Sequence, residues 1–340
     1  MAQVYNQQSR LVTTDARKDS ATHALRSKRP HDAEVPCLLS LMHRHDLAAT
    51  MAIPAVNATE AFRKDFGFLR YRQDQASVDP ETVSVKRNAY WCYCGPLLDP
   101  TSSSEPESSL PANFYEFAAA SFTGPVDSRF APFLSFINAV LLSKGLGHYM
   151  LTVRATTPTH EFDRPRWHTD ELFFSDLTKG NLPGTGLGLK SRVDSSGRKN
   201  GTNWKICTTL LGPSTLFVPL EYQGSARKKQ EKARKDASTD HDCLSIRCVG
   251  CASAADSVRE ELASTLEPFG FEAAMPGECC VFKVGKQAGA IHSEPCMSDS
   301  QHGRIFINVV PGTEEELRSL TQKWGMEFPR QWWVGSSSSR

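Results

Sequence analysis

Short apolar runs, each bounded by glycine or proline, recur between residues 146 and 312 and favour β-structure there. Residues 147–156 alternate between apolar and polar side chains, as a half-buried strand does. Residues 204–219 predict two strands around a Gly-Pro turn, and the apolar run at 277–285 lies between two glycines. A β-branched run follows at 304–310. This succession predicts a β-rich domain rather than a helical bundle.

Helices are expected around these strands. Residues 128–144 form an apolar run that ends at Gly145, and residues 313–320 begin with Thr313 as a candidate N-cap before an acidic turn. The expected fold class is therefore mainly β with flanking helices, an α+β fold. We expect the helix at 128–144 to pack on a sheet.

Four side chains form a candidate metal and ligand site. His168 and Asp170 are two residues apart, so on a strand they point to the same side, and His292 supplies a second imidazole. Two imidazoles and one carboxylate make the facial triad of non-haem Fe(II) oxygenases, which leaves sites open for an oxidisable co-substrate and dioxygen. Arg304, one strand further on, could pair with the free carboxylate of 2-oxoglutarate.

In this order and setting the chain resembles the Fe(II)/2-oxoglutarate-dependent oxygenase superfamily over about residues 146 to 312. The turn Leu210–Thr215 and the end of this region are most similar to an uncharacterised oxygenase-like family. The resemblance implies a double-stranded β-helix core, also called a jelly-roll or cupin-like core. It also implies Fe(II) held by His168, Asp170 and His292, with the distal carboxylate of 2-oxoglutarate on Arg304. Hydroxylation or demethylation of an unknown substrate would follow.

The resemblance has further implications for single residues. Retention of Asp170 favours oxygen transfer over halogenation. Thr208 or Thr209, on the strand between the ligands, could hydrogen-bond the co-substrate. Two residues after its arginine the family often has Ser or Thr, whereas this chain has Phe306.

Other interpretations of the same residues stay open. His292 and Glu294 could form a rival metal frame with His302. The protein could use another metal chemistry without 2-oxoglutarate, with Arg304 binding a substrate carboxylate. It could also be a non-catalytic jelly-roll binding or regulatory protein.

The composition narrows the partners and the compartment. A net charge of +1 gives no global attraction to nucleic acid or anionic membranes. No apolar run is long enough to span a bilayer, and the first thirty residues lack the apolar centre of a signal peptide. We therefore expect an intracellular protein, cytoplasmic or nuclear and not secreted, with reduced cysteines. Cys243, Cys248 and Cys251 have a spacing that could alternatively bind zinc.

The expected domain organisation centres on residues 111–325, a jelly-roll domain with polar insertions at 176–203 and 223–242. The first insertion directly follows the candidate ligands and could form a lid. The second is basic; it is expected to be a solvated helix or a disordered loop, with a nucleic-acid patch as the alternative. Outside the domain we expect a tail at 1–35, an extension and linker at 36–110 and a tail at 326–340.

Overall fold

The structure is a computed structural model that describes residues 60–72, 83–98, 110–160, 163–174, 203–237, 249–285, 287–298 and 300–336. The predicted tail at 1–35 and almost all of the insertion at 176–203 lie outside the described residues. The same holds for Cys243, Cys248 and the side chain of Cys251.

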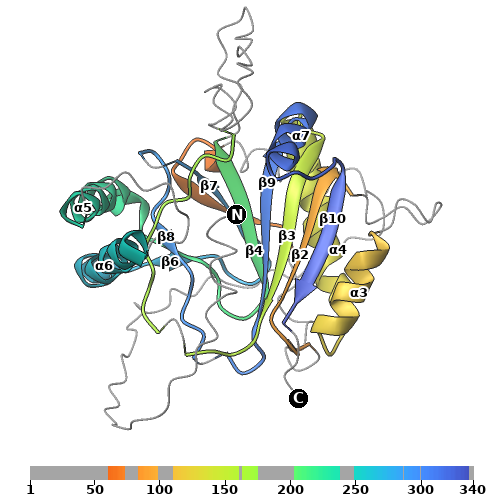
Figure 1. Ribbon diagram of the computed structural model, residues 1–340, viewed down its shortest axis with the longest axis horizontal. Coiled ribbons are helices and arrows are strands. Elements are labelled where there is room, and N and C mark those ends of the chain that lie inside the picture. Colours follow the sequence, from red (N-terminus) through yellow and green to blue (C-terminus); the bar gives the residue numbers. More distant parts are fainter. Residues whose placement is uncertain are drawn as a thin grey trace, which may run out of the picture.

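Two antiparallel sheets form the body of the protein (Figure 1), which confirms the expected α+β class with a mainly β core. The larger sheet has seven strands in the spatial order β1 (Phe66–Arg70), β7 (Glu278–Lys283), β4 (Trp204–Leu211), β9 (Arg304–Gly312), β3 (His148–Thr156), β2 (Ala89–Pro96) and β10 (Arg330–Gly335). The smaller sheet has the order β6 (Glu272–Ala273), β5 (Leu216–Phe217) and β8 (His292–Ser293).

From β3 onward the chain passes repeatedly between the two sheets. After β3, residue His168 forms a bridge to β8 of the smaller sheet, and the chain then returns to the larger sheet as β4. Strands β5 and β6 belong to the smaller sheet, β7 to the larger, β8 to the smaller and β9 to the larger. Neighbouring strands in each sheet are therefore mostly not consecutive in the chain.

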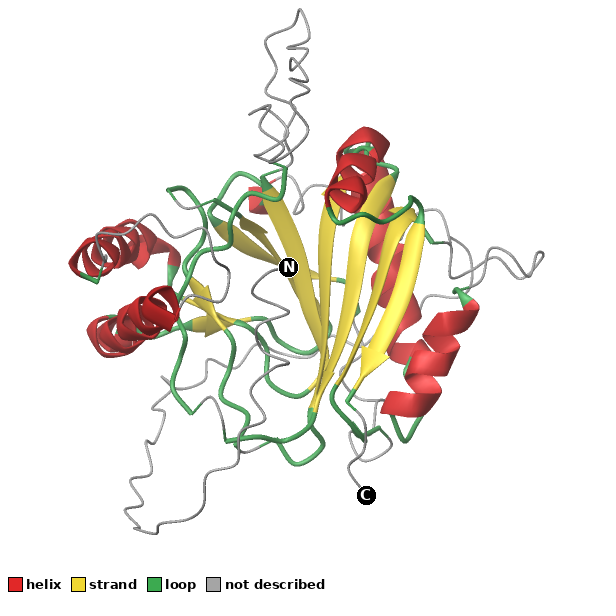
Figure 2. Cartoon of the chain, in the orientation of Figure 1, coloured by secondary structure: helices red, strands yellow, loops and turns green. Residues whose placement is uncertain are grey.

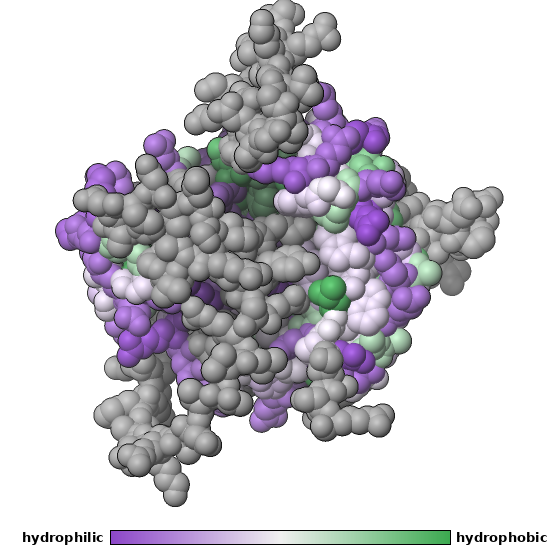
Figure 3. Space-filling view, in the orientation of Figure 1, coloured by the Kyte–Doolittle hydropathy of each residue, from purple (hydrophilic) through white to green (hydrophobic). Residues whose placement is uncertain are grey.

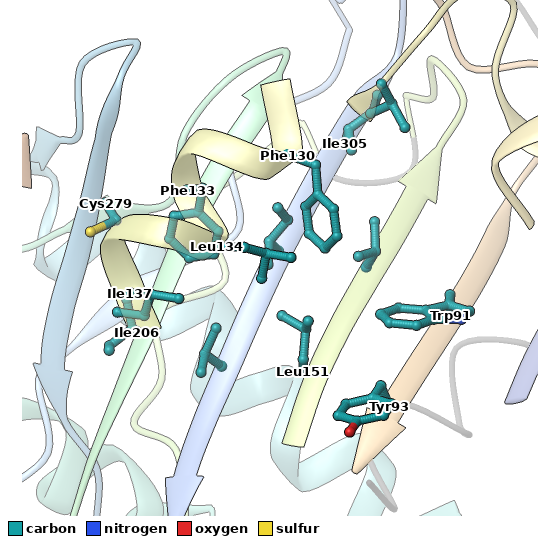
Figure 4. Packing of buried hydrophobic residues seen from close by; sticks show 14 of the residues in the cluster. Trp91, Tyr93, Phe130, Phe133, Leu134, Ile137, Leu151, Ile206, Cys279 and Ile305 are labelled. Carbon is teal, nitrogen blue, oxygen red and sulfur yellow. The ribbon is translucent and has the colours of Figure 1, made fainter. Parts of the chain in front are cut away.

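One face of the larger sheet is covered by the helices α3 (Ala112–Ser121) and α4 (Asp127–Ser143), as predicted for the apolar run at 128–144. Phe130, Phe133 and Ile137 of α4 pack on Leu151 and Ile206 of the sheet (Figure 4). Complete burial of each such side chain stabilises the fold by about 1.5–3 kcal/mol. The helix layer covers one face of the larger sheet, and the candidate site lies on the opposite face.

Of the remaining helices, one packs on β9, β3 and β2 at the face of the larger sheet opposite to α3 and α4, and two lie beside the smaller sheet (Figure 2). Helix α7 (Glu314–Lys323) begins with a capping box between Thr313 and Glu316, which confirms the predicted N-cap. Helices α5 (Gln223–Asp236) and α6 (Val249–Thr265) form a pair beside the smaller sheet, with the short turns η4 (Leu220–Tyr222) and η5 (Glu267–Phe269) next to them.

The basic segment predicted as a solvated helix or a loop is helical as far as Asp236. One side of this helix is nevertheless buried, because Ala226, Gln230 and Ala233 recur at helical spacing and pack inward. The surface around α5 and α6 is mostly hydrophilic (Figure 3). Among the described residues, no helix has the length and apolar character needed to cross a membrane.

The larger sheet uses chain from both sides of the domain expected at 111–325. Strands β1 and β2 come from the segment expected to be an extension and linker, and β10 lies within the expected tail at 326–340. Trp332 and Trp333 of β10 pair with Cys92 and Trp91 of β2. Edge strands such as β1 and β10 pair over long sequence distances that local patterns do not reveal.

Candidate metal and co-substrate site

Backbone pairing brings His168 and His292 together. The amide of His168 donates to the carbonyl of His292 at 2.9 Å, and the amide of His292 donates back to the carbonyl of His168 at 3.0 Å. The centroids of the two imidazole rings are 4.4 Å apart. Two segments far apart in the sequence thus present their side chains from one short stretch of antiparallel backbone.

Both imidazoles are oriented by backbone carbonyls. Nδ1 of His168 lies 2.7 Å from the carbonyl oxygen of Arg166, and Nδ1 of His292 lies 3.0 Å from that of Ala290. A carbonyl only accepts, so the hydrogen-bond network assigns the proton to Nδ1 and a free lone pair to Nε2. The Nε2 atoms lie 3.9 Å and 3.7 Å from the carboxylate of Asp170. Burial lowers the pKa of His292 to about 4, which keeps the ring neutral at pH 7.

His168, Asp170 and His292 offer ligand atoms that all lie within 4.8 Å of one another. Two imidazoles and a carboxylate are a donor set that suits Fe(II), so the residues fit the metal that the sequence predicts. In the described ranges this is the one such group of histidine, cysteine and acidic side chains. The rival frame with Glu294 and His302 does not assemble there.

Asp170 is anchored at both its backbone and its side chain. Its carbonyl oxygen accepts from the amide of Gly285 at 2.7 Å, and Nζ of Lys205 donates to Oδ2 at 2.5 Å. Burial would raise the pKa of this carboxyl, but the Lys205 ammonium and the two imidazoles outweigh burial and hold the pKa well below its usual range. Asp170 is therefore ionised, as a metal ligand must be.

Arg304 lies at the start of β9 and is 5% exposed. Its Nε donates to the carbonyl of Pro213 at 2.9 Å, an Nη donates to the hydroxyl of Thr215 at 3.2 Å, and the guanidinium stacks 4.4 Å from the centroid of Phe306. Burial lowers the pKa of Arg304 to about 10, so the side chain is still charged at pH 7. The guanidinium is thus fixed in orientation by neutral partners.

The turn before Thr215 depends on Gly212. Its φ of +81° lies in the left-handed region, and a Cβ there would meet the carbonyl oxygen of Gly303 at 2.6 Å and Cα of Arg304 at 3.2 Å. A side chain at this position would displace the backbone that carries Arg304. Glycine therefore lets the turn at Pro213 approach the arginine closely enough to accept its hydrogen bond.

The two predicted threonines face opposite sides of β4. Thr208 points to the helix layer, where its hydroxyl donates to the carbonyl of Glu278 at 2.9 Å and lies 3.3 Å from the Tyr71 hydroxyl. The predicted contact of Thr208 with the co-substrate is therefore not supported. Thr209 lies on the other face and lines a small cavity with Cys207 and Thr215.

Lys205 and Thr215 were not among the predicted site residues. Lys205 alternates with the buried Ile206, so period-2 spacing places it on the same face of β4 as Cys207 and Thr209. A charged residue inside an otherwise apolar strand was the signal that could have revealed it. Thr215 lies directly after the predicted Gly-Pro turn, but nothing in the sequence indicates that this turn folds against Arg304.

No family model and no curated protein matches this chain. Among solved structures, the chain is similar to the non-heme iron oxygenase OrfP in complex with Fe, succinate and (3R,4R)-dihydroxy-L-Arg. The identity is 11%, the TM-score is 0.31, and the match covers 78% of this chain and 81% of that one. A second structure of OrfP matches at 10% identity and a TM-score of 0.30, with the same coverage. The similarity is too low to carry an argument, so the function is argued from the site.

Proposed function

We propose that this protein is an Fe(II)- and 2-oxoglutarate-dependent oxygenase that hydroxylates or demethylates an organic substrate. The observation that carries the proposal is the convergence of two imidazoles and one ionised carboxylate between the two sheets. His168, Asp170 and His292 would hold the metal through Nε2, a carboxylate oxygen and Nε2. A ferrous ion at these ligands would supply the activation of dioxygen that oxidation of a C–H bond requires.

We further propose that β3 to β9 form a double-stranded β-helix. The alternation of the chain between a larger and a smaller antiparallel sheet supports this arrangement. The His168 bridge would stand for the second of its eight strand segments, and β9, which carries Arg304, for the eighth. In such a core the side chains between the two sheets surround the site, which is where the triad and Arg304 lie.

Arg304 is the proposed anchor for the distal carboxylate of 2-oxoglutarate. Among the described residues no carboxylate lies within ion-pair distance of its guanidinium, although the side chain is almost fully buried. The carboxylate of Glu294 attracts this guanidinium, but from beyond ion-pair distance. Burial of a charge costs several kcal/mol, and a dicarboxylate ligand in direct contact would offset that cost. The bidentate geometry of a guanidinium suits a carboxylate.

Thr215 would complete this anchor. Its hydroxyl already accepts a hydrogen bond from Arg304 at 3.2 Å and has a proton to donate to the same carboxylate. It would supply the hydroxyl that a serine or threonine at position 306 would otherwise provide, while Phe306 supports the guanidinium by stacking. Thr209 and Cys207 would line the path between this anchor and the triad.

Anaerobic titration of the full chain with Fe(II) and then 2-oxoglutarate tests the proposal without knowledge of the substrate. Chelation of the keto acid by the bound metal produces a visible charge-transfer band, which we expect for the wild type. We expect no band for His292→Ala, because one metal ligand is missing.

Two other outcomes would contradict the proposal in distinct ways. Metal binding without the band would indicate a metal enzyme that does not use 2-oxoglutarate. Absence of metal binding would leave the non-catalytic binding or regulatory protein as the better interpretation.

A further inference from the structure

We propose that Lys205 is a positioning residue that restricts Asp170 to metal coordination through a single oxygen and so keeps space at the metal for the keto acid. This inference rests on the proposed metal site and adds a residue to it that the triad pattern does not contain. Its basis is the geometry of one buried ion pair.

The Lys205 ammonium engages one of the two carboxylate oxygens of Asp170. The distance from Nζ to Oδ2 is 2.5 Å, and the side chains are only 13% and 15% exposed. Oδ1 lies 3.9 Å from Nε2 of His168, and Oδ2 lies 3.7 Å from Nε2 of His292. Within the described part of the chain, Oδ2 has a hydrogen bond to Lys205, whereas Oδ1 has none. One oxygen is thus committed to the protein, and one is available to a metal.

Aromatic rings restrain the ammonium in this place. Nζ lies 5.6 Å from the ring centroid of Phe173 and 5.5 Å from that of Phe282, within the range of cation–π attraction. Phe282 also packs on the His292 ring, with centroids 4.8 Å apart. Lys205 is therefore held by the same packing that orients a metal ligand.

A cation beside a ligand carboxylate has two consequences for a metal at this site. It lowers the negative charge that the carboxylate presents, which weakens attraction of a divalent ion. It also hydrogen-bonds the second oxygen, which then cannot chelate the metal together with the first. Typical outer-shell partners of metal ligands strengthen metal binding, so the expected effect of removing Lys205 has the opposite sign.

The test compares wild type with Lys205→Met, which keeps the length of the side chain and its contact with both rings. Mn(II) affinity is measured by titration calorimetry, and 2-oxoglutarate affinity is measured from the anaerobic charge-transfer band of the Fe(II) protein. We expect Lys205→Met to bind Mn(II) roughly tenfold more tightly because the repulsion is removed. We expect it to bind 2-oxoglutarate at least about tenfold more weakly because Asp170 now occupies a second position.

Two further variants control for charge and folding. Lys205→Arg retains the cation and its hydrogen bond and should keep both affinities near those of the wild type. Lys283→Met removes another lysine that pairs with an aspartate, Asp65 at 3.4 Å, outside the site, and should change neither affinity. If Lys205→Met does not fold, as judged by thermal melting, Lys205→Leu serves for the same comparison, because leucine also lacks both the charge and the hydrogen-bond donor.

The opposite shifts of the two affinities distinguish positioning from mere structural support. If both affinities fall together, or if neither changes, the proposed role of Lys205 is wrong while the metal site stands. If wild type binds no metal, both this inference and the proposed function are overturned.

Discussion

Buried charges are balanced differently at the two ends of the candidate site, the triad and Arg304. At the triad, Asp170 is ionised and already has a counter-ion in Lys205. At the start of β9, Arg304 is also largely buried, but its direct partners are a carbonyl, a hydroxyl and an aromatic ring, and the carboxylate of Glu294 acts on it only from a longer distance. The metal end is thus electrostatically complete before any ligand arrives, whereas the Arg304 end is stabilised by an incoming anion. This difference explains how one pocket could bind its metal and its co-substrate by separate means.

The strongest test of the difference is Asp170→Ala. Loss of a direct ligand should weaken Mn(II) binding by more than about 100-fold, since even outer-shell changes often cost 10–100-fold. The metal-free protein should also lose about 3–5 kcal/mol of its free energy of unfolding, because Lys205 is left buried without its partner. Calorimetric titration and urea unfolding measure the two effects. Retention of full metal affinity would disprove the triad.

Arg304→Met should give the reverse pattern. We expect the affinity for 2-oxoglutarate to fall by about 2–5 kcal/mol, since a buried charged contact to the ligand is lost. Mn(II) affinity should stay unchanged, and the free energy of unfolding of the ligand-free protein should not decrease, because no ion pair is broken. A loss of stability as large as that of Asp170→Ala would show that the guanidinium has a protein counter-ion after all.

Lowering the pH should reduce the free energy of unfolding through protonation of His292 at the metal end of the site. The pKa of His292 is lowered to about 4 in the folded protein, against about 6.5 when unfolded, so the unfolded state binds more protons between these values. The stability contributed by the neutral ring is complete above pH 6.5 and is lost as the pH falls towards 4. The change is about 3 kcal/mol. Urea unfolding of the metal-free protein across this range should show the loss, and His292→Gln should reduce it; equal pH profiles for both proteins would contradict the assignment.

The smallest expected effect separates the two threonines near Arg304. Thr215→Val removes a hydroxyl from the proposed anchor and should weaken 2-oxoglutarate binding by about 1 kcal/mol, the usual net value of one hydrogen bond. Thr208→Val is the matched control on the opposite face of β4 and should leave this affinity unchanged. The charge-transfer band reports both. If Thr208→Val weakened 2-oxoglutarate binding more than Thr215→Val did, the co-substrate would lie on the helix-layer face of β4, which would contradict the proposal.

The triad and its surroundings differ in how far they could be predicted from the sequence. His168 and Asp170 follow from local spacing, because two residues on a strand share a face whatever the rest of the fold does, whereas His292 follows from the order of motifs that the resemblance implies. The ion pair between Asp170 and Lys205 does not follow from local spacing, since the face that Lys205 occupies depends on the register of β4 with its neighbours.

The same reason explains why the sequence left Thr208 and Thr209 as alternatives. Two adjacent threonines always face opposite sides of a strand, and the choice between them needs the position of the helix layer. The places of the edge strands β1 and β10 in the larger sheet were not predicted for a related reason, because their partners lie far away in the sequence. The side-chain types available to the site can be read from the sequence. The face on which each side chain lies, and the strand with which each strand pairs, are determined only by the folded sheet.

The reciprocal hydrogen bonds between His168 and His292 also determine when the site can exist. All strands from β4 to β7 lie between these residues in the chain, so the pair cannot close before that whole segment has been synthesised. A chain that ends before His292 has no triad. A truncated chain of that kind would therefore lack one of the proposed metal ligands.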